Sequence, residues 1–351
     1  MYDVLVIGAG QAGLAAGHYL KQSGFSFLII DAASSIGNSW RNRYDSLHLF
    51  TPRIYDVLPG IPLKGNKHGL PDKDEIADYL ENYSKQMELP IKLECQAIRL
   101  WKKEGIYYAE TTHGVIEARN IIVATGPFQV KNVPHFSKTI SDNVIQLHSS
   151  EYRNPTQLAP GTTVVVGGGN SGAQIAAELA LDHKQSVYIS IAREITFKPL
   201  YIMKRSVFWF FEKLGILRAS NESWVGKWLQ NQPEYVYGYE LKELIKRGEV
   251  LVYPRAVNAI DDRIIYEDGS ELKADNVIWA TGYKRSDQWI DIANAFNSKG
   301  MILHNKGESP VKGLYFVGLP WQTSRGSALL GWVKYDAQRI VNSIPGKNTL
   351  N

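Results

Sequence analysis

Short apolar runs, each followed by glycines and a helical pattern, recur along this chain, and the first lies at its N-terminus. Residues 4–7 are apolar, and a helical pattern runs from Ala9 towards Leu20. A second apolar run covers residues 25–30. Apolar runs of this length on either side of a helix are typical of buried parallel strands. The N-terminal segment therefore predicts a strand–helix–strand unit of an α/β sheet.

Glycines connect the first predicted strand to its helix. Gly8, Gly10 and Gly13 have the spacing G-x-G-x-x-G. The first glycine permits a tight turn, the second lets a pyrophosphate approach the backbone, and the third lets the helix pack against the strand. The helix N-terminus supplies free N–H groups for the phosphates, and Asp31, after the second strand, can accept hydrogen bonds from a ribose. The segment predicts dinucleotide binding; a tight turn in an ordinary α/β sheet is the alternative.

The same pattern returns in the second half of the chain. An apolar run at residues 163–166 leads into a second glycine-rich turn and a helical pattern, and a further run covers residues 186–191. The residues of this turn expected to face a dinucleotide are Gly167, Gly169, Asn170, Ser171 and Gly172. Each half also contains an apolar strand that ends in Ala-Thr-Gly, at residues 124–126 and 280–282. The first glycine lies 116 residues before this alanine in the first half and 113 in the second, which indicates an internal repeat and two dinucleotide sites.

The two predicted sites differ at the sugar. Asp31 suits a ribose with both hydroxyls free, whereas Arg193, 21 residues after Gly172, suits a 2′-phosphate. This difference favours NADP over NAD in the second site. The alternative is that Arg193 pairs with its neighbour Glu194 on the surface.

Composition excludes several other kinds of protein. The 351 residues carry a net charge of +4 in scattered basic pairs, which is too mild and too dispersed for nucleic-acid binding. Cys95 is the only cysteine, so disulfide scaffolds, CxxC pairs and cysteine metal sites are excluded. The eight histidines show no metal-ligand spacing. There is neither a cleavable leader nor an apolar run of about 18 residues, so we expect a cytoplasmic protein without a metal or a transmembrane segment.

The remaining residues of the first half predict further elements. Gly37, which tolerates a left-handed backbone, predicts a sharp loop in which Trp40 either covers the sheet edge or closes over a cofactor. A helix is expected over residues 72–87, capped by Asp72 or Asp74. Residues 91–117 predict a β-meander with Cys95 as a half-buried apolar residue, and the apolar run before residue 124 predicts a separate buried strand. Residues 127–162 are expected to form the linker out of the first domain.

Aromatic residues gather in the second half, between residues 197 and 232, where their spacing predicts one or two amphipathic helices. A core or subunit interface is the first interpretation, and a substrate entrance or membrane-skimming surface is the alternative. Residues 314–318 predict a last buried strand, which we assign back to the first module. A glycine-rich turn at residues 326–330 and a closing helix to about Val341 follow.

Together these patterns predict an α/β fold of two Rossmann-like dinucleotide-binding domains, the second inserted in the first. The first domain is expected to be discontinuous, with residues 1–156 and 280–351. The second is expected to cover residues 157–279.

These residues resemble the flavin-containing monooxygenase-like family, in its short bacterial branch. The likeness covers nearly the whole chain and rests on residues 8–13, 37–41, 167–172, 280–283 and 326–330. It implies FAD in the first domain and NADPH in the second. The residues expected at FAD are Gly8, Gly10, Gly13, Asp31, Ala32, Gly37, Trp40, Arg41, Ala124, Thr125, Gly126, Gly318, Ser327, Ala328 and Leu329, and those expected at NADP are Gly167, Gly169, Asn170, Ser171, Gly172, Arg193, Thr281 and Gly282.

The chain departs from the family pattern in two places. Residues 148–152 match the end of the family's linker signature, F-x-G-x-x-x-H followed by a serine and an aromatic residue, but Asp142 and Val144 stand where its Phe and Gly belong. Tyr152, in place of the Trp of Baeyer–Villiger enzymes, points towards oxygenation at N or S. Phe50 stands where larger members place an asparagine near the flavin, so Phe50 and Trp40 are the side chains expected to flank the flavin in catalysis.

The resemblance implies an FAD- and NADPH-dependent monooxygenase. Such an enzyme transfers one oxygen atom from O2 to a small organic substrate, at a soft N or S centre or a ketone, through a flavin C4a-hydroperoxide. The alternative is an NAD(P)H–flavin reductase that passes electrons to a quinone, a small disulfide or a carrier protein. A flavin that is only structural or sensory is a third reading. The expected partners are a small-molecule substrate and O2, with a homodimer as the expected assembly.

Overall fold

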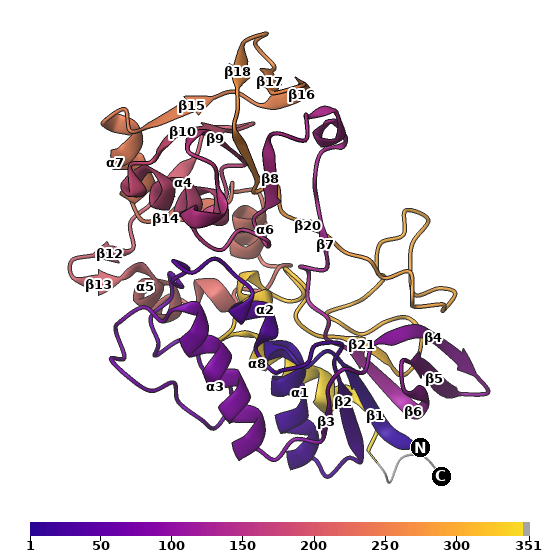
Figure 1. The fold of residues 1–351 in the computed structure, drawn as a ribbon. Coiled ribbons are helices and arrows are strands. Elements are labelled where there is room, and N and C mark those ends of the chain that lie inside the picture. The colour runs from indigo at the N-terminus through magenta and orange to yellow at the C-terminus, as the bar shows by residue number, and fades with distance from the viewer. Residues whose placement is uncertain (347–351) are drawn as a thin grey trace.

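Two β-sheets form the cores of two halves of the molecule, which lie one above the other in Figure 1. The structure is a computed structural model, and it describes residues 1–346. The lower sheet has the order β3-β2-β1-β6-β5-β4, with β21 also paired to β6. Its strands are β1 (Tyr2–Ile7), β2 (Phe27–Ile30), β3 (Ile91–Lys92), β4 (Ala97–Lys103), β5 (Ile106–Thr111), β6 (Gly114–Val123) and β21 (Leu314–Phe316). The pairs among β1, β2, β3, β6 and β21 are parallel, whereas β4, β5 and β6 form the predicted antiparallel meander.

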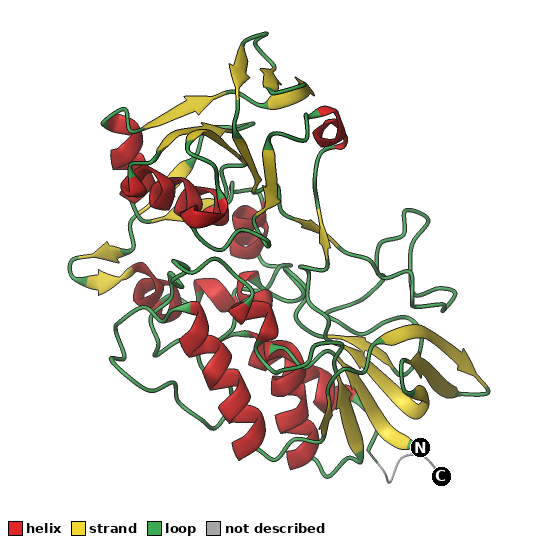
Figure 2. Ribbon diagram, viewed as in Figure 1, coloured by secondary structure: helices red, strands yellow, loops and turns green. Residues whose placement is uncertain are grey.

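Helices pack on the lower sheet and bury its apolar strands (Figure 2). They are α1 (Gln11–Gln22), α3 (Lys73–Gln86) and the predicted closing helix α8 (Val333–Ser343). Leu14 and Leu20 of α1 and Ile340 of α8 share one core with Val4 and Val6 of β1, and all five are fully buried. Burial contributes roughly 1.5–3 kcal/mol for each large apolar side chain. This packing, with the pairing of β21 to β6, confirms that the C-terminal segment returns to the first module.

Asp72 caps α3. Its carboxylate accepts the backbone N–H groups of Asp74 at 2.9 Å and Glu75 at 2.8 Å. The Glu75 carboxylate in turn accepts the backbone N–H of Asp72 at 3.0 Å, which completes a capping box. Of the two predicted caps, Asp72 is therefore the correct one.

The upper sheet repeats the arrangement with the order β15-β10-β9-β19-β8, all parallel. Its strands are β8 (Ile145–His148), β9 (Gly161–Val166), β10 (Gln185–Ser190), β15 (Val250–Tyr253) and β19 (Asn276–Trp279). Helices α4 (Asn170–Asp182) and α7 (Glu240–Lys246) pack on it, and β16 (Ala256–Ile260), β17 (Arg263–Tyr266) and β18 (Glu271–Lys273) form a separate antiparallel sheet. The neighbouring strands β10-β9-β19 of the upper sheet correspond in order to β2-β1-β6 of the lower sheet. The structure thus confirms the α/β class with two dinucleotide-binding folds, the second inserted in the first.

The structure corrects three expectations about the connections. The segment expected to be a linker contributes an edge strand to the upper sheet, because β8 pairs with β19. A single ten-residue strand, β6, replaces the two expected strands, since one part of it pairs with β5 and the other with β21. Cys95 is fully buried rather than half-buried. The domain limits at residues 156 and 279 stay a prediction.

The aromatic stretch forms small elements between the two sheets. It contains the two expected short helices, α5 (Val207–Lys213) and α6 (Trp224–Gln230). With its flanking residues it also forms the unexpected strands β11 (Thr196–Lys198), β12 (Tyr201–Ile202), β13 (Arg205–Ser206) and β14 (Tyr235–Tyr237). The turn of hairpin β12–β13 places Met203 and Lys204 at positive φ. Neither residue type signals such a turn, which is why the pattern did not reveal it.

The chain crosses between the two halves through β7 (Val130–Lys131) and returns through β20 (Tyr283–Lys284), and these two strands pair with each other. The remaining elements are α2 (Asn38–Arg41) and the short 3₁₀ turns η1 (His135–Thr139), η2 (Pro155–Gln157), η3 (Ile216–Arg218) and η4 (Arg325–Ala328). Within residues 1–346, no helix has the length and apolar character that crossing a membrane requires.

Candidate functional site

The two glycine turns have nearly the same packing. A Cβ added at Gly13 would lie 1.8 Å from the carbonyl oxygen of Gly8, and one added at Gly172 would lie 2.0 Å from that of Gly167. Both distances are far inside van der Waals contact. The third glycine of each motif is therefore required by the close approach of helix and turn, as the sequence pattern predicted.

The Ala-Thr-Gly segments close over the two turns in the same way. A Cβ at Gly8 would lie 2.6 Å from the carbonyl oxygen of Ala124, and a Cβ at Gly167 would lie 2.3 Å from that of Ala280. The structure thus brings Ala124 and Thr125 to the first turn and Ala280 to the second. The internal repeat extends from sequence spacing to atomic contacts.

Both turns fit a phosphate. The middle glycine of the first turn, Gly10, has no atom within 4 Å of an added Cβ, and the only neighbour of Gly169 is a Glu234 oxygen at 4.0 Å. These two glycines are the N-caps of α1 and α4, and neither helix has a side chain that caps its N-terminus. The first N–H groups of both helices can therefore bind a ligand, and helix N-termini favour anions.

The two residues predicted to meet the ribose of each dinucleotide, Asp31 and Arg193, have different surroundings. The Asp31 carboxylate accepts the backbone N–H groups of Ala9 at 2.6 Å and Ala33 at 2.8 Å, so it is tied to the first turn, next to Ala32. Arg193 is exposed and forms no ion pair with any residue in 1–346, Glu194 included. The surface pairing considered as the alternative is therefore not formed, and the Arg193 guanidinium can meet a ligand.

The C-terminal segment folds back onto the first turn. The Gln11 amide donates to the carbonyl oxygen of Ala328 at 3.1 Å. Gly318 lies against α1, where an added Cβ would lie 2.9 Å from the Cβ of Ala12. The Ser327 hydroxyl oxygen accepts two backbone N–H groups at 3.0 and 3.1 Å and so fixes η4. Gly318, Ser327 and Ala328 are thereby brought to the turn of Gly8, Gly10 and Gly13.

The loop at residues 37–41 is held mainly by α3. Gly37 has a left-handed φ of 80° as expected, and Trp40 packs against the core of the first domain. Arg41 forms ion pairs with Asp78 at 2.7 Å and Glu81 at 2.8 Å, both on α3. The Arg41 side chain therefore holds α2 on α3, and its predicted contact with FAD stays a prediction.

Phe50 joins the two domains through an aromatic cluster. Its ring centroid lies 5.0 Å from that of Tyr237 and 5.7 Å from that of Phe208, both in stacked geometry. Leu329 packs against the same cluster. The Asn170 side chain bonds the backbone of Tyr235 at 3.0 Å and of Tyr237 at 3.3 Å, which ties β14 to the second turn. Phe50, Leu329 and Asn170 are thus brought together.

The Thr-Gly pairs lie where the chain crosses between domains. The Thr281 hydroxyl and the side chain of Asn132 bond each other's carbonyl oxygens. The Gln129 amide donates to the Thr125 hydroxyl and to the carbonyl of Gly126, each at 3.0 Å. His148 lies 2.9 Å from the carbonyl of Gly282. Thr281 and Gly282, like Thr125 and Gly126, are therefore linked to the β7–β20 crossing.

Sequence reasoning missed the residues that connect the loop after α2 with the second domain. The Tyr44 hydroxyl donates to Gln174 of α4 at 2.6 Å, and burial raises its pKa well above the ordinary value. Ser171 of the second turn also bonds Tyr44. The Arg43 guanidinium bonds the Tyr283 hydroxyl and lies over its ring. The only sequence signal was the cluster of arginines and aromatics around Trp40.

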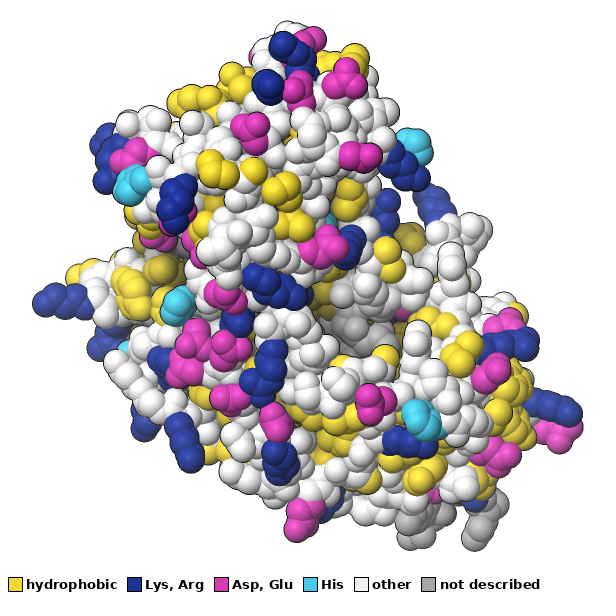
Figure 3. Space-filling model, in the orientation of Figure 1, with side chains coloured by type: hydrophobic (Ala, Val, Ile, Leu, Met, Phe, Trp, Pro, Cys, Tyr) yellow, Lys and Arg dark blue, Asp and Glu magenta, His cyan; other side chains and the backbone are white. Residues whose placement is uncertain are grey.

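Several of the predicted residues therefore lie at the junction of the two domains, where the surface in Figure 3 is hollowed. Gln11 links the first turn to η4, and Arg325 of η4 lies 5.4 Å from the ring centroid of Tyr235. Tyr235 in turn is held by Asn170 of the second turn. A continuous line of contacts thus runs from one dinucleotide turn to the other. Such an arrangement can hold two dinucleotides toward one another.

Known proteins resemble this chain over nearly its whole length. The model of the pyridine nucleotide-disulphide oxidoreductase family matches residues 5–204. The uncharacterized oxidoreductase CzcO of Bacillus subtilis is 48% identical over 347 residues, which are 99% of this chain and 100% of the relative. The probable indole-3-pyruvate monooxygenase YUCCA8 of Arabidopsis thaliana is 26% identical over 97% of this chain and 88% of its own length.

A solved structure has the same architecture. The flavin-containing monooxygenase from Stenotrophomonas maltophilia superposes with a TM-score of 0.81 at 26% identity. The match covers 98% of each chain. The arrangement of both domains is therefore shared, including the insertion of the second in the first.

Proposed function

Since the chain belongs to the pyridine nucleotide-disulphide oxidoreductase family, we propose that it is an FAD- and NADPH-dependent monooxygenase that transfers one oxygen atom from O2 to a small organic substrate. The family and its flavin monooxygenase relatives bear out the resemblance, an oxidoreductase activity and the pair FAD and NADP. The observation that carries the proposal is the pair of matched glycine turns, joined by contacts within one chain. The expected target is a soft N or S centre, with a ketone as the other option.

The residues fit the two cofactors in different ways. In the first domain the open turn at Gly10 and the Asp31 carboxylate would hold the pyrophosphate and ribose of FAD. In the second, the open turn at Gly169 would hold the pyrophosphate of NADPH, and the unpaired Arg193 would bind its 2′-phosphate. When bound, the flavin supplies the activation of O2 once NADPH has reduced it.

The side chains around the junction exclude water and fix the domains. Phe50, Phe208 and Tyr237 form an apolar wall beside Leu329, and a dry environment of this kind suppresses side reactions of a reduced flavin. The Tyr44–Gln174 hydrogen bond holds the second domain against the loop of the first. Phe50 and Trp40 thus act by shaping the site rather than by transferring protons.

A rapid-mixing absorbance experiment on the purified flavoprotein tests the proposal. The protein is reduced with NADPH, with NADH as the comparison, and then mixed with oxygenated buffer with and without amines, sulfides and ketones. We expect a transient species whose spectrum differs from those of oxidised and reduced flavin, and which decays faster with a substrate. Direct reoxidation with stoichiometric hydrogen peroxide would contradict the proposal and favour a reductase with another electron acceptor.

We also propose that the protein is a cytoplasmic homodimer. Trp224 and Trp228 on α6 are 82% and 52% exposed, and indole rings are enriched at protein interfaces. A cytoplasmic location fits an enzyme that consumes NADPH. Sedimentation velocity should give a dimer for the native chain and a monomer for the variant with Trp224→Asp and Trp228→Asp. A native monomer at micromolar concentration would contradict the assembly.

A further inference from the structure

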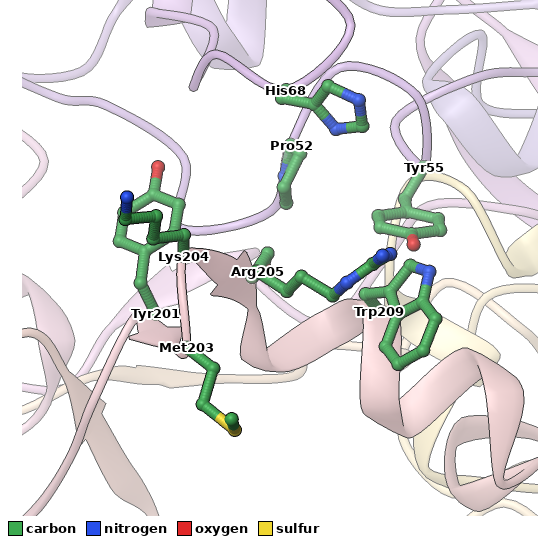
Figure 4. Close-up of a pocket in the computed structure, with 9 residues that line it drawn as sticks. Pro52, Tyr55, His68, Tyr201, Met203, Lys204, Arg205 and Trp209 are labelled. Atoms are coloured by element: carbon green, nitrogen blue, oxygen red, sulfur yellow. The ribbon is translucent and has the colours of Figure 1, made fainter.

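A second concave site lies outside the two glycine turns, between the loop that follows Phe50 and hairpin β12–β13 (Figure 4). The cavity has a volume of about 460 Å³. Pockets that bind small molecules commonly have volumes of about 300 to 1,000 Å³. None of the residues predicted for FAD or NADP lines this cavity. It therefore has the size for a separate ligand of one or two rings.

Aromatic rings form much of the cavity wall. Tyr55, Tyr201 and Trp209 line it. The Tyr55 ring stacks on buried Trp332 at 5.9 Å between centroids, so its orientation is fixed by the core. Figure 4 shows the rings of Tyr55 and Trp209 facing the same space. Rigid rings of this kind bind a planar ligand at low cost in side-chain entropy.

The two lining residues that carry a charge at neutral pH, Lys204 and Arg205, are both cationic. His68, Lys204 and Arg205 line the cavity, and no acidic residue does. The Arg205 guanidinium carbon lies 4.4 Å from the centroid of Trp209, and in Figure 4 the guanidinium extends between Trp209 and Tyr55. Neither Lys204 nor Arg205 forms an ion pair with another residue in the part of the chain that the structure describes.

Two acidic residues, Glu212 and Glu75, are paired with arginines outside the cavity lining. Burial, and then the charge of Glu212, raises the pKa of Tyr55. Glu212 itself accepts the indole N–H of Trp332 at 2.9 Å and pairs with Arg218 at 3.4 Å. Glu75 is paired with Arg53. The positive charge of the cavity is therefore not neutralised by the protein's own carboxylates.

We propose that this cavity binds a planar aromatic carboxylate. The ring would lie against Tyr55 and Trp209, and the carboxylate would be bound by Arg205, whose planar guanidinium matches the geometry of two carboxylate oxygens. Lys204, at the hairpin turn, adds a second positive charge at the mouth. The site is independent of the monooxygenase activity proposed above, since it requires binding alone.

Titration calorimetry on the flavin-loaded protein tests this site with three matched probes. These are 2-naphthoate, the neutral 2-naphthylmethanol, and acetate, which has the charge without the ring. We expect 2-naphthoate to bind at least tenfold more tightly than either of the others, and addition of saturating NADP to leave its affinity unchanged. Equal affinity for the neutral ring, or displacement of 2-naphthoate by NADP, would overturn the proposal.

Charge-removing variants locate the binding. Arg205→Gln should weaken 2-naphthoate binding at least fivefold, and adding Lys204→Gln should weaken it further. Lys227→Gln, on exposed α6 and outside the cavity, is the matched control and should leave the affinity unchanged. An unchanged affinity in Arg205→Gln, with native thermal unfolding, would refute the assignment. Because no turnover is measured, this outcome is separate from failure of the monooxygenase proposal.

Discussion

The first and second dinucleotide turns share their backbone packing but differ in what surrounds them. Both need glycine at the third motif position, with added Cβ atoms 1.8 and 2.0 Å from a carbonyl oxygen. At the first turn, the Asp31 carboxylate accepts the N–H of Ala9, and the carbonyl of Ala328 accepts from the Gln11 amide. At the second turn, Arg193 has no ion-pair partner within residues 1–346. The first turn is thus tied to its surroundings by the protein's own groups, whereas the second has an unpaired cation nearby.

The largest expected effect comes from filling the middle glycine of each turn. Gly10 and Gly169 have extended backbones with φ of −75° and −77°, so a valine fits each conformation while its side chain occupies the phosphate position. Gly10→Val should give a folded protein without FAD. Gly169→Val should keep FAD, while its reduction by NADPH slows at least a hundredfold. Flavin content after purification measures the effect of Gly10→Val, and stopped-flow reduction measures the effect of Gly169→Val. Loss of flavin in both variants would show that the two turns do not bind different cofactors.

The unpaired arginine provides the next test. Arg193→Gln should raise KM for NADPH about tenfold, because one charge-assisted interaction of about 1.4 kcal/mol is lost, and should leave KM for NADH unchanged. Arg247→Gln in the same domain is the control, since Arg247 pairs with Glu249. Steady-state kinetics with both nucleotides decide the result. An equal increase for NADPH and NADH would show that Arg193 does not bind the 2′-phosphate.

A smaller effect is expected at the acid of the first site. Asp31→Asn keeps the shape of the side chain but removes the charge that accepts the N–H groups of Ala9 and Ala33. Loss of a charged hydrogen-bond acceptor costs about 1 kcal/mol or more, so FAD affinity should fall roughly fivefold. Fluorescence titration of the apoprotein with FAD measures this change. Unchanged affinity would mean that Asp31 only shapes the turn.

A further test is the pH dependence of stability at a buried acid of the first domain. Asp56 is buried, accepts a hydrogen bond from Thr51 and has its pKa raised by burial to about 8. Its folded-state pKa lies above its unfolded value, so its contribution to stability is complete below about pH 4 and is lost as pH rises towards about 8. The loss is at most about 1.4 kcal/mol per pH unit. Asp56→Asn should flatten the dependence of the unfolding free energy on pH over this range, as measured by urea denaturation; an unchanged slope would contradict it.

The predictable features of this protein are those that local backbone geometry requires. Gly13 and Gly172 could be found because a turn that packs this closely admits no side chain, whatever the rest of the fold. The contact of Tyr44 with Gln174 joins residues separated by 130 positions, and no local pattern encodes such a contact. Arg41 shows the same limit, since its partners on α3 could not be read from the sequence around it.

The edge strand β8 was missed for a related reason. It has only four residues, three of them half-buried, so its apolar pattern is too weak to separate it from a loop. Its pairing with β19 depends on a strand more than a hundred residues later. The hairpin β12–β13 contributes two cations to the proposed anion site. The sequence pattern did not predict this hairpin either, because its turn has Met203 and Lys204 at positive φ, where such residue types are uncommon.

The paired strands β7 and β20 have a mechanical consequence. The backbone passes from the lower half to the upper half and back through this one antiparallel pair, in which Tyr283 lies opposite Lys131. Two covalent connections bonded to each other form a single hinge. Separating the two halves would break this strand pair and also the contacts of Tyr44 with Gln174 and of Phe50 with Tyr237. Any change in the angle between the two halves therefore has to bend the β7–β20 pair and rearrange these contacts at the same time.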